Sequence, residues 1–322
     1  MTKRVAVLMG GWSSERQVSL WSGAGCAKAL RECGYDVIEI DVGRDVALRL
    51  AEVEPDVAFL ALHGVGGEDG TIQGLLEVMG IPYTHSGVLA SATAMDKQTA
   101  KRIVKAAGVP VAEGKLVARA DAARAHVMAR PYVLKPNDGG SSVGVHIVRE
   151  DMANPPQELW REDYEHGDVL LAERYIPGME LTCAVMGDVA LGVIEIVQNA
   201  AFYDFEAKYA PGGSTHVYPA RVKPNVYQSI QQLTLTAHTA LGCRGVTRAD
   251  FRYDDRPHGT GEIVFLELNT VPGMAPTSLV PELAAHAGHS FADLVRWLVE
   301  DASCGRTGVE RGRVNAGDFP RR

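Results

Sequence analysis

A lysine followed at once by a run of small residues forms the first group with chemical potential. Lys135 ends a short apolar run, and segment 135–144 has the sequence KPNDGGSSVG. Glycines let backbone N–H groups approach phosphate oxygens closely, serines add hydroxyl donors, and the lysine adds positive charge. The segment predicts a phosphate-binding loop, although its lysine precedes the glycines, unlike a Walker A loop. Taken alone, it is equally compatible with a Gly/Ser hairpin turn.

Two triplets nearer the C-terminus combine carboxylates with an amide. Arg248 and Asp250 alternate on one predicted strand, and Glu267 and Asn269 alternate on another. Side chains two residues apart on a strand share a face, so each triplet presents its polar groups together. Buried carboxylates are costly unless they are paired or bind a metal, and this oxygen-rich set suits Mg²⁺. A cross-strand ion pair between Arg248 and one acid is the alternative interpretation.

Three glycine-containing loops could contribute further groups. Segment 270–279, directly after the predicted metal strand, could offer backbone N–H groups to an oxyanion, or could be a plain Pro/Gly connector. In segment 10–16, Glu15 either stabilises the first turn of a helix or binds an ammonium group. The G-x-G-x-x-G spacing of a dinucleotide site is absent there. His63 opens the third loop, and we expect it only to orient other groups.

The elements that must position these groups change character along the chain. In the first part, apolar strands alternate with helices, which predicts a parallel sheet covered on both faces, with ligands beyond the carboxyl ends of its strands. The predicted strands are 4–9, 36–41 and 56–62, and a long helix is predicted over 18–33. A further helical segment is predicted over 95–108.

The rest of the chain predicts two α+β units. Short strands are predicted at 132–135, 145–148 and 169–173, and then at 181–186, 189–197, 247–253 and 263–268. A helix is predicted over 225–241. Segment 198–219 is rich in aromatic and charged residues, and we expect a long, weakly structured, functional loop there.

Composition bounds the class of protein. The chain has 322 residues, of which 46% are hydrophobic and 22% charged, as expected for a globular enzyme of two or three domains. The net charge of -8 argues against general binding of nucleic acid or anionic membranes. The five cysteines are scattered without a C-x-x-C pair, which favours free thiols in a reducing cytoplasm. The apolar run 5–9 is too short for a secretory signal or a membrane span.

Taken jointly, these segments resemble the D-alanine–D-alanine ligase family of the ATP-grasp superfamily. The resemblance covers residues 4–301 and begins with GG-x-S-x-ER-x-VS-x-x-SG in segment 10–23. It continues through LHGVGGEDGTIQG, MDK, KPNDGGSSVG, FYDFEAKY, TRADF and ELNTVPGM, in segments 62–74, 95–97, 135–144, 202–209, 247–251 and 267–274. Single segments are unspecific, but their common order and spacing are highly specific. Val271 departs from the small polar residue of many relatives.

The resemblance implies an ATP-grasp fold, with ATP bound between the central and C-terminal domains. Its parts would be an N-terminal parallel α/β substrate domain, a small central α+β domain and a C-terminal α+β catalytic domain. The implied boundaries are 1–94, 95–178 and 179–303, followed by a disordered tail over 304–322.

The resemblance also implies the reaction. ATP and two D-alanine molecules would give ADP, phosphate and D-alanyl-D-alanine through a D-alanyl phosphate intermediate, supplying peptidoglycan synthesis. Two Mg²⁺ or Mn²⁺ ions would assist, held by Asp250, Glu267 and Asn269. The family further implies a homodimer. D-alanine would be the partner molecule, with no nucleic acid or membrane involved.

Residue roles follow from the resemblance in the same way. The implied ATP-binding residues are Lys97, Lys135, Ser142, Glu173, Arg174, Ile176, Glu180, Tyr203 and Lys208. Glu15 and His63 would bind the first D-alanine, and Ser278 and Leu279 the second. The implied catalytic residues are Glu15, Ser141 and Tyr209, which would hydrogen-bond together, and Arg248 and Gly273, which would stabilise the oxyanion.

Three alternatives remain open at this point. A D-alanine–D-lactate ligase shares the chemistry, but the pair Lys208-Tyr209 favours dipeptide formation. A catalytically silent ATP-binding regulator would have little need of both the metal set and Lys208. An oxidoreductase with a dinucleotide fold is weaker still.

Overall fold

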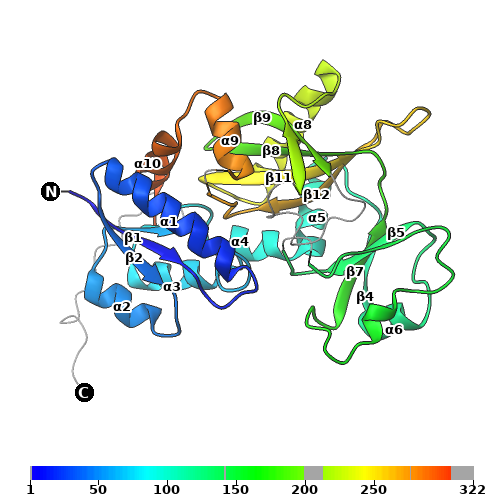
Figure 1. The fold of residues 1–322 in the computed structure, drawn as a ribbon, viewed down its shortest axis with the longest axis horizontal. Coiled ribbons are helices and arrows are strands. Elements are labelled where there is room, and N and C mark those ends of the chain that lie inside the picture. Colours follow the sequence, from blue (N-terminus) through cyan, green and yellow to red (C-terminus); the bar gives the residue numbers. More distant parts are fainter. Residues whose placement is uncertain (1, 141–142, 199–212, 276, 306–322) are drawn as a thin grey trace.

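The structure is a computed structural model that describes residues 2–140, 143–198, 213–275 and 277–305. The described residues form three sheets, which Figure 1 shows side by side with their helices. Within these ranges, no helix combines the length and the apolar character needed to cross a membrane.

The first sheet is parallel and lies between two layers of helices. Its strands are β1 (Arg4–Met9), β2 (Asp36–Asp41) and β3 (Val57–Leu60), and β1 lies in the middle. Val5 and Val7 face a core with helices α1 (Arg16–Glu32) and α10 (Phe291–Asp301). Ala6 and Leu8 point the other way, into a core with helices α2 (Val46–Val53) and α3 (Thr71–Met79). The predicted two-faced parallel sheet is confirmed.

The second sheet is antiparallel and carries the glycine-rich loop. Its strand order is β4-β7-β5-β6, and the strands are β4 (Gly114–Ala118), β7 (Val169–Arg174), β5 (Tyr132–Pro136) and β6 (His146–Val148). Helix α6 (Arg119–Arg124) and the short helix η1 (Gln157–Trp160) cover one face through a small core around Tyr132 and Leu159. The loop after β5 leaves this sheet toward the third sheet.

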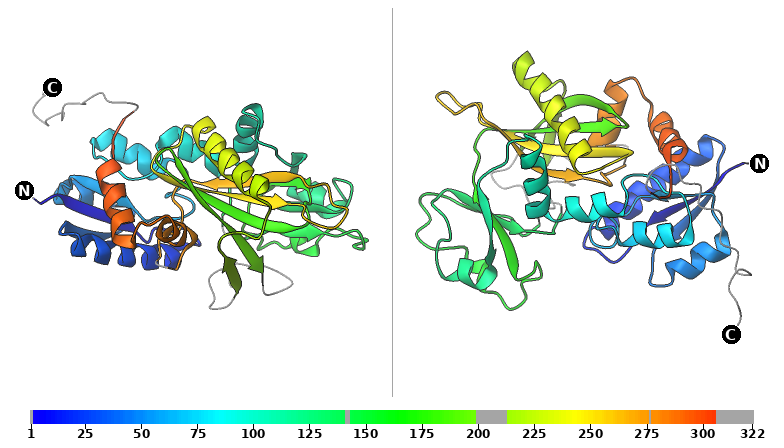
Figure 2. Two further views of the ribbon diagram at one scale, coloured as in Figure 1. Left: turned by 90° about the horizontal axis from the view of Figure 1, so that it is seen from above. Right: turned by 180° about the vertical axis from the view of Figure 1, so that it is seen from behind.

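The third sheet is the largest and is also antiparallel. Its order is β10-β9-β8-β11-β12, with β10 (Ser214–Val217), β9 (Val189–Gln198), β8 (Met179–Met186), β11 (Val246–Tyr253) and β12 (Ile263–Asn269). Phe251 and Phe265 face a core with helices α5 (Lys97–Ala106) and α8 (Pro224–Ala240). The opposite face packs on α9 (Leu279–His286) and α10, in the same core as α1. Figure 2 shows α10 beside the first sheet, so the C-terminal helices join the first and third sheets.

A pair of short helices joins the first sheet to the other two. Helix α4 (Val88–Met95) ends at Asp96, whose side chain accepts a hydrogen bond from Thr99 N at 2.7 Å and so caps α5. The carboxylate satisfies one of the free N–H groups at the start of α5. Helix α5 confirms the helix predicted over 95–108. Its cap at Asp96 fixes the position of Lys97, the first residue of the helix.

Two expectations need correction. Segment 198–219 was expected to be weakly structured, but its described end forms the edge strand β10, paired from Ser214↔Gln198 to Val217↔Glu195. The neighbouring strand supplies the backbone partners, which the polar sequence does not reveal. The expected tail also begins too early, because its first two residues contact Glu77: Cys304 Sγ lies 3.3 Å from Oε2 and Gly305 N donates to Oε1 at 2.8 Å. The remaining tail residues, 306–322, lie outside the described part of the chain.

Candidate active site

A cavity of about 470 Å³ lies between the second and third sheets. Strands of both sheets contribute charged and apolar side chains to it. Its lining includes Lys135 from β5, Glu173 from β7, Ile176 from the following connection, and Glu180, Arg252 and Glu267 from β8, β11 and β12. A cavity that is apolar in part and has a few convergent charges is typical of a small-molecule site.

A buried carboxylate, that of Glu173, lies between two lysines at this cavity. Glu173 is 3% exposed, its Oε1 contacts Lys135 Nζ, and its Oε2 lies 2.7 Å from Lys101 Nζ. Burial would raise the pKa of Glu173, but the two ammonium groups outweigh it and lower the pKa to about 2. Burial, with the charge of Lys135, lowers the pKa of Lys101 to about 8. Glu173, Lys101 and Lys135 therefore form one group of ionisable side chains that is largely shielded from solvent.

Lys97 connects the glycine-rich loop to the acidic strand β12. Its Nζ donates to the carbonyl of Gly139 and lies 3.3 Å from Glu267 Oε2. The loop is fixed in turn, because Asn137 Nδ2 donates to Asp96 at 2.7 Å and Lys97 N donates to the Asn137 carbonyl at 2.9 Å. The predicted lysine, loop and carboxylate thus lie together. Ser141 and Ser142 lie outside the described residues.

Three more of the predicted ATP-binding residues, Arg174, Ile176 and Glu180, line the same cavity. Arg174 turns its guanidinium to Glu262, with two hydrogen bonds of 2.8 Å, while Ile176 is 3% exposed. Glu180 accepts a hydrogen bond from Gln198 Nε2 at 2.9 Å. Their contribution to ATP binding stays a prediction. Tyr203 and Lys208 lie outside the described residues.

The predicted metal residues occupy paired positions on β11 and β12. Arg248 is opposite Asn269, and Asp250 is opposite Glu267. Arg248 donates two hydrogen bonds to Asp250, of 2.9 and 2.8 Å, so the ion pair lies within one strand rather than across two. Asp250 also accepts from Thr182 at 2.6 Å, and Asn269 Nδ2 lies 3.3 Å from it. Asp250 is thus held by hydrogen bonds from three neighbours, Arg248, Thr182 and Asn269.

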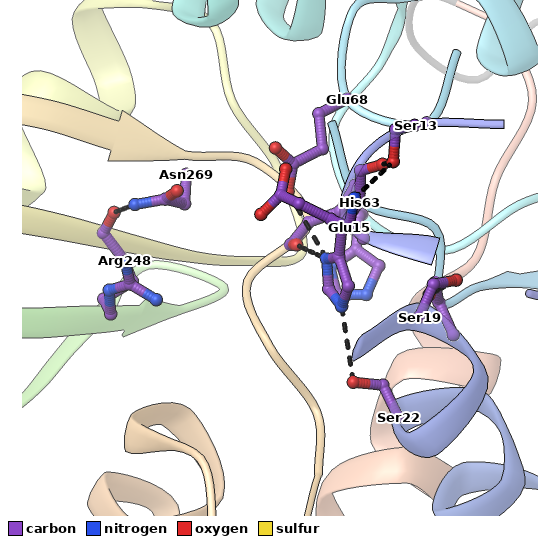
Figure 3. Close-up of polar contacts among 12 residues, drawn as sticks. Ser13, Glu15, Ser19, Ser22, His63, Glu68, Arg248 and Asn269 are labelled. Carbon is purple, nitrogen blue, oxygen red and sulfur yellow. Dashed lines mark hydrogen bonds and ion pairs between the residues drawn. The ribbon is translucent and has the colours of Figure 1, made fainter. Parts of the chain in front are cut away.

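A second group of acids lies at the carboxyl ends of β1 and β3. Figure 3 shows the carboxylates of Glu15 and Glu68 near the His63 ring, with Arg248 and Asn269 across from them on strands of the third sheet. Ser13 joins the two loops, because its Oγ donates to the His63 carbonyl at 2.7 Å and accepts from Glu15 N at 3.2 Å. Both acids thus face the space between the first and third sheets.

Both ring nitrogens of His63 have partners. Nδ1 lies 3.2 Å from the Val271 carbonyl and 3.6 Å from Glu68, and Nε2 lies 3.3 Å from Ser22 Oγ. Burial lowers the pKa of His63, but Glu68 and Glu15 outweigh it and raise the pKa above its ordinary value. Burial and the charge of Glu15 raise the pKa of Glu68, against the effect of His63. These contacts fix the orientation of the His63 ring, and its role in the reaction stays a prediction.

The glycine-rich loop reaches these acids. A Cβ built on Gly140 would lie 3.0 Å from Glu15 Oε2, so the loop and the acid are in close contact. A Cβ on Gly64 would lie 2.7 Å from the same oxygen. Any larger side chain at either position would displace the carboxylate. Glu15 therefore lies beside the loop that leads to the cavity.

The last predicted loop brings Gly273 to the start of α9. A Cβ on Gly273 would lie 3.1 Å from Ser278 Oγ, and Ser278 is the N-cap of the helix that begins at Leu279. A helix N-terminus presents free N–H groups, which favour an anion such as a carboxylate. Tyr209, the remaining predicted catalytic residue, lies outside the described residues.

Some residues of the site were not predicted individually. Lys101 follows Lys97 by four residues on one helix, so helical spacing places both on one face. Glu68 was only part of a polar loop, and Ser22 only part of a motif. Arg252 follows Asp250 by two residues on β11, which strand alternation could have revealed.

Comparison with known proteins agrees with this geometry. A family model described as D-ala D-ala ligase C-terminus matches residues 103–300, and one described as D-ala D-ala ligase N-terminus matches residues 49–86. A protein named D-alanine–D-alanine ligase from Xanthobacter autotrophicus is 67% identical over 307 residues, which cover 95% of this chain and 100% of that protein.

Solved structures share the fold. The D-alanine–D-alanine ligase of Bacillus anthracis complexed with ATP has a TM-score of 0.76 at 29% identity, covering 93% of this chain and 97% of that one. The VanG D-Ala:D-Ser ligase of Enterococcus faecalis has a TM-score of 0.75 at 29% identity, covering 93% and 99%. Sequence identity along almost the whole chain, the two family models and the ATP-grasp fold agree: this chain belongs to the D-alanine–D-alanine ligase family.

Proposed function

We propose that this chain is a D-alanine–D-alanine ligase that forms D-alanyl-D-alanine for peptidoglycan synthesis and releases ADP and phosphate from ATP. One observation carries the proposal beyond family membership. Lys97 joins the glycine-rich loop to Glu267 at the nucleotide-sized cavity, and Gly140 of the same loop abuts Glu15. A phosphate site and an ammonium site are therefore adjacent, as the transfer of a phosphoryl group to an amino acid requires.

ATP occupies the cavity with its adenosine toward Ile176 and Glu180 and its phosphates toward Lys97 and Lys135. The apolar lining suits the base, and the lysines offset phosphate charge. Lys101 remains beside Glu173 when Lys135 turns to the nucleotide, so the buried carboxylate keeps a cation within 2.7 Å. Lys135 can therefore move from Glu173 to a phosphate without leaving the buried carboxylate unpaired.

Asp250, Glu267 and Asn269 would hold Mg²⁺ or Mn²⁺. The donor set fits, because their hard oxygens stand on adjacent paired positions beside Lys97 and Arg248. Among the described residues no three His, Cys, Asp or Glu side chains form a metal cluster by themselves, so phosphate oxygens would complete the coordination. Bound there, the ions would offset the negative charge of the transferring phosphoryl group.

The first D-alanine binds with its ammonium group at Glu15 and its carboxylate toward the γ-phosphate. Its carboxylate oxygen attacks the γ-phosphorus in line, the bond to the β-phosphate oxygen breaks, and ADP and D-alanyl phosphate form. Glu68 and His63 lie beside Glu15 and keep that side of the pocket polar. The positioning of the two reactants supplies much of the rate, since it replaces a bimolecular encounter.

The second D-alanine binds with its carboxylate at Ser278 and the start of α9. Its neutral amine attacks the acyl carbon of D-alanyl phosphate, and the oxyanion is stabilised by Arg248 and the Gly273 N–H. Phosphate leaves and the amine loses its proton, which gives the dipeptide. Asp250 fixes the direction of Arg248 through two hydrogen bonds, so this donor is preorganised.

The setting of the enzyme follows from the same proposal. We place it in the cytoplasm, where its five free cysteines would remain reduced. The domains would span 1–94, 95–178 and 179–303, and two copies would form a homodimer. Light scattering tests the dimer, since a monomer mass at micromolar concentration would exclude it.

The function is tested by phosphate release from Mg-ATP with D-alanine, L-alanine, or D-alanine together with D-lactate or D-serine. We expect phosphate release to require D-alanine. We expect the variant Glu15→Gln to lose this release. Lys28→Gln, on an exposed face of α1, is the matched control and should behave like the unchanged protein. Faster release with D-lactate or D-serine would transfer the assignment to a ligase with another acceptor, and no release with any substrate would refute it.

A further inference from the structure

Arg252 holds the backbone connection between the second and third sheets. It projects from β11, its Nε donates to the Ile176 carbonyl at 3.1 Å, and its Nη2 donates to the Gly178 carbonyl at 2.7 Å. These two carbonyls flank the turn from β7 to β8. Two hydrogen bonds from one planar guanidinium restrict both the position and the orientation of this turn.

The same guanidinium faces a carboxylate of the cavity. Arg252 Nη1 lies 3.6 Å from Glu180 Oε2, and that oxygen also accepts from Gln198 Nε2 at 2.9 Å. The side chains of Arg252 and Glu180 are 18% and 20% exposed, so the pair is sheltered. All three residues, with Ile176, line the cavity. One arginine thus links the carboxylate and the backbone on the adenosine side.

The charge of Glu180 limits which part of a nucleotide it can contact. A carboxylate repels phosphate oxygens but accepts hydrogen bonds from the uncharged donors of a nucleoside, the ribose hydroxyls and the base amine. Glu173 lies at the lysine end, paired with Lys101 and Lys135. Glu180 is the second residue of β8, directly after the turn that follows β7, and lines the same cavity. A ribose hydroxyl is the donor that this position fits.

We propose that Arg252 is a positioning residue for the ribose of the nucleotide. It acts through Glu180 and through the Ile176 and Gly178 carbonyls, which it holds at fixed positions relative to one another. Discrimination between a ribonucleotide and a deoxyribonucleotide therefore depends on Arg252 although Glu180 makes the contact. The inference rests on the proposed function only for the binding of an adenine nucleotide.

A purely structural role for Arg252 makes a different prediction. Gly178 already presses the turn against the end of β11, since a Cβ there would lie 2.1 Å from the Tyr253 carbonyl. The turn keeps this contact without Arg252, so Arg252→Met should fold. If Arg252 only stabilised the fold, its loss would lower the unfolding temperature and leave nucleotide discrimination unchanged.

The test measures the dissociation constants of ADP, 2′-deoxyADP and 3′-deoxyADP by calorimetry. The variants are Arg252→Met, Arg252→Lys, Glu180→Gln and the double variant Arg252→Met/Glu180→Gln. Arg221→Met is the matched control, because Arg221 pairs with Glu195 on the same sheet but does not line the cavity. Thermal unfolding without nucleotide checks the fold of each.

We expect the unchanged protein to prefer ADP over one of the deoxynucleotides by roughly tenfold, the scale of one hydrogen bond to a charged group. Arg252→Met should weaken ADP binding by about the same factor and abolish the preference, and Arg252→Lys should retain part of it. The double variant should bind ADP no more than about twofold more weakly than Glu180→Gln alone, because both substitutions remove one contact. Arg221→Met should match the unchanged protein.

The inference would be overturned if Arg252→Met still preferred ADP over the deoxynucleotide. It would also be overturned if the double variant weakened ADP binding by the product of the two single effects. The assay needs no turnover, so its failure is separate from that of the proposed function. Normal ADP binding without D-alanine-dependent turnover would refute the ligase and leave the ribose inference standing. Absence of all nucleotide binding would refute both.

Discussion

Glu173 illustrates at the residue scale how burial and neighbouring charge together set a protonation state. Its carboxylate lies between Lys101 and Lys135 and is 3% exposed. Removing one partner from a buried ion pair is more costly than the pair is beneficial, because the remaining charge is left desolvated. The three groups should therefore be treated as one unit in any substitution experiment.

The first prediction concerns acid stability. The pKa of Glu173 is about 2 in the folded protein, below the ordinary 4.5, so its stabilising effect is complete above pH 4.5 and is lost as the pH falls toward 2. We expect a loss of about 3 kcal/mol from this group over that window. Denaturant titrations at several pH values measure it.

The variant Glu173→Gln tests this assignment. It should be less stable at pH 7 and should show a shallower loss of stability between pH 4.5 and 2. Asp163→Asn is the control, because Asp163 pairs with Arg161 on the exposed surface. An unchanged acid slope in Glu173→Gln would show that other carboxylates dominate acid unfolding.

The second prediction concerns the metal residues. Glu267→Gln keeps the shape of the side chain but removes the negative charge, so we expect the Mg²⁺ concentration for half-maximal activity to rise by roughly tenfold or more. Activity at saturating Mg²⁺ should fall as well, since Lys97 also loses its charged partner. A magnesium titration of phosphate release would reject the assignment if the half-maximal concentration stayed the same.

The sequence predicted some of these contacts but not others. Alternation on two strands indicated that Asp250 and Glu267 carry a metal-binding face, and the structure places them opposite each other. The pairing of Lys101 with Glu173 could not be derived in the same way. Lys101 lies on helix α5 and Glu173 on strand β7, which are far apart in the chain. Contacts between distant elements depend on packing that no local pattern records.

At the scale of elements, two side-chain contacts join β10 and the residue after it to α9, the helix that begins at the proposed acceptor site. His216 Nδ1 lies 2.6 Å from Glu282 Oε2, and the rings of Tyr218 and His286 stack with their centres 3.6 Å apart. Both contacts anchor the helix that begins just after Ser278. The position of its N-terminus should depend on this edge of the sheet.

The third prediction follows from that contact. His216→Ala should raise the KM for the second D-alanine by roughly threefold, the scale of one partly exposed side-chain hydrogen bond, and leave the KM for ATP unchanged. Glu282→Ala should act alike, and the two substitutions together should add little to either one. Equal increases in both KM values would show a general loss of structure instead.

The fourth prediction concerns the start of α10. Ser290 Oγ accepts from Asp293 N at 3.1 Å, and Asp293 accepts from Ser290 N, which completes a capping box. Ser290→Ala should lower the free energy of unfolding by about 1 kcal/mol. Ser290→Thr, which keeps the hydroxyl, is the control. Because α10 lies outside the cavity lining, the KM values should not change.

Elements with a strong apolar periodicity could be predicted from the sequence. Elements that form only because they pair with a neighbouring strand could not. The predicted helix 225–241 differs from α8 (Pro224–Ala240) by one residue at each end, since its apolar stripe and Pro224 define it. Strand β10 has no such signal, because its four residues are largely polar and pair at an edge. Its existence depends on β9.

At the scale of the whole molecule, the elements of each sheet supply a different part of the proposed reaction site. Glu15 lies in the loop between β1 of the first sheet and α1, Lys135 lies on β5 of the second sheet, and Arg248 and the predicted metal residues lie on β11 and β12 of the third. The family resemblance predicted this division, but apolar periodicity alone gave only two kinds of sheet. The relative placement of the sheets comes from cores that combine residues far apart in the chain.

The central claim is that D-alanine is activated as an acyl phosphate before the dipeptide forms. The most direct test uses D-alanine labelled with ¹⁸O in its carboxylate, together with Mg-ATP, and measures phosphate and product by mass spectrometry. The account predicts one ¹⁸O atom in each released phosphate and D-alanyl-D-alanine in equal amount. Released phosphate without ¹⁸O, or phosphate release without the dipeptide, would contradict it.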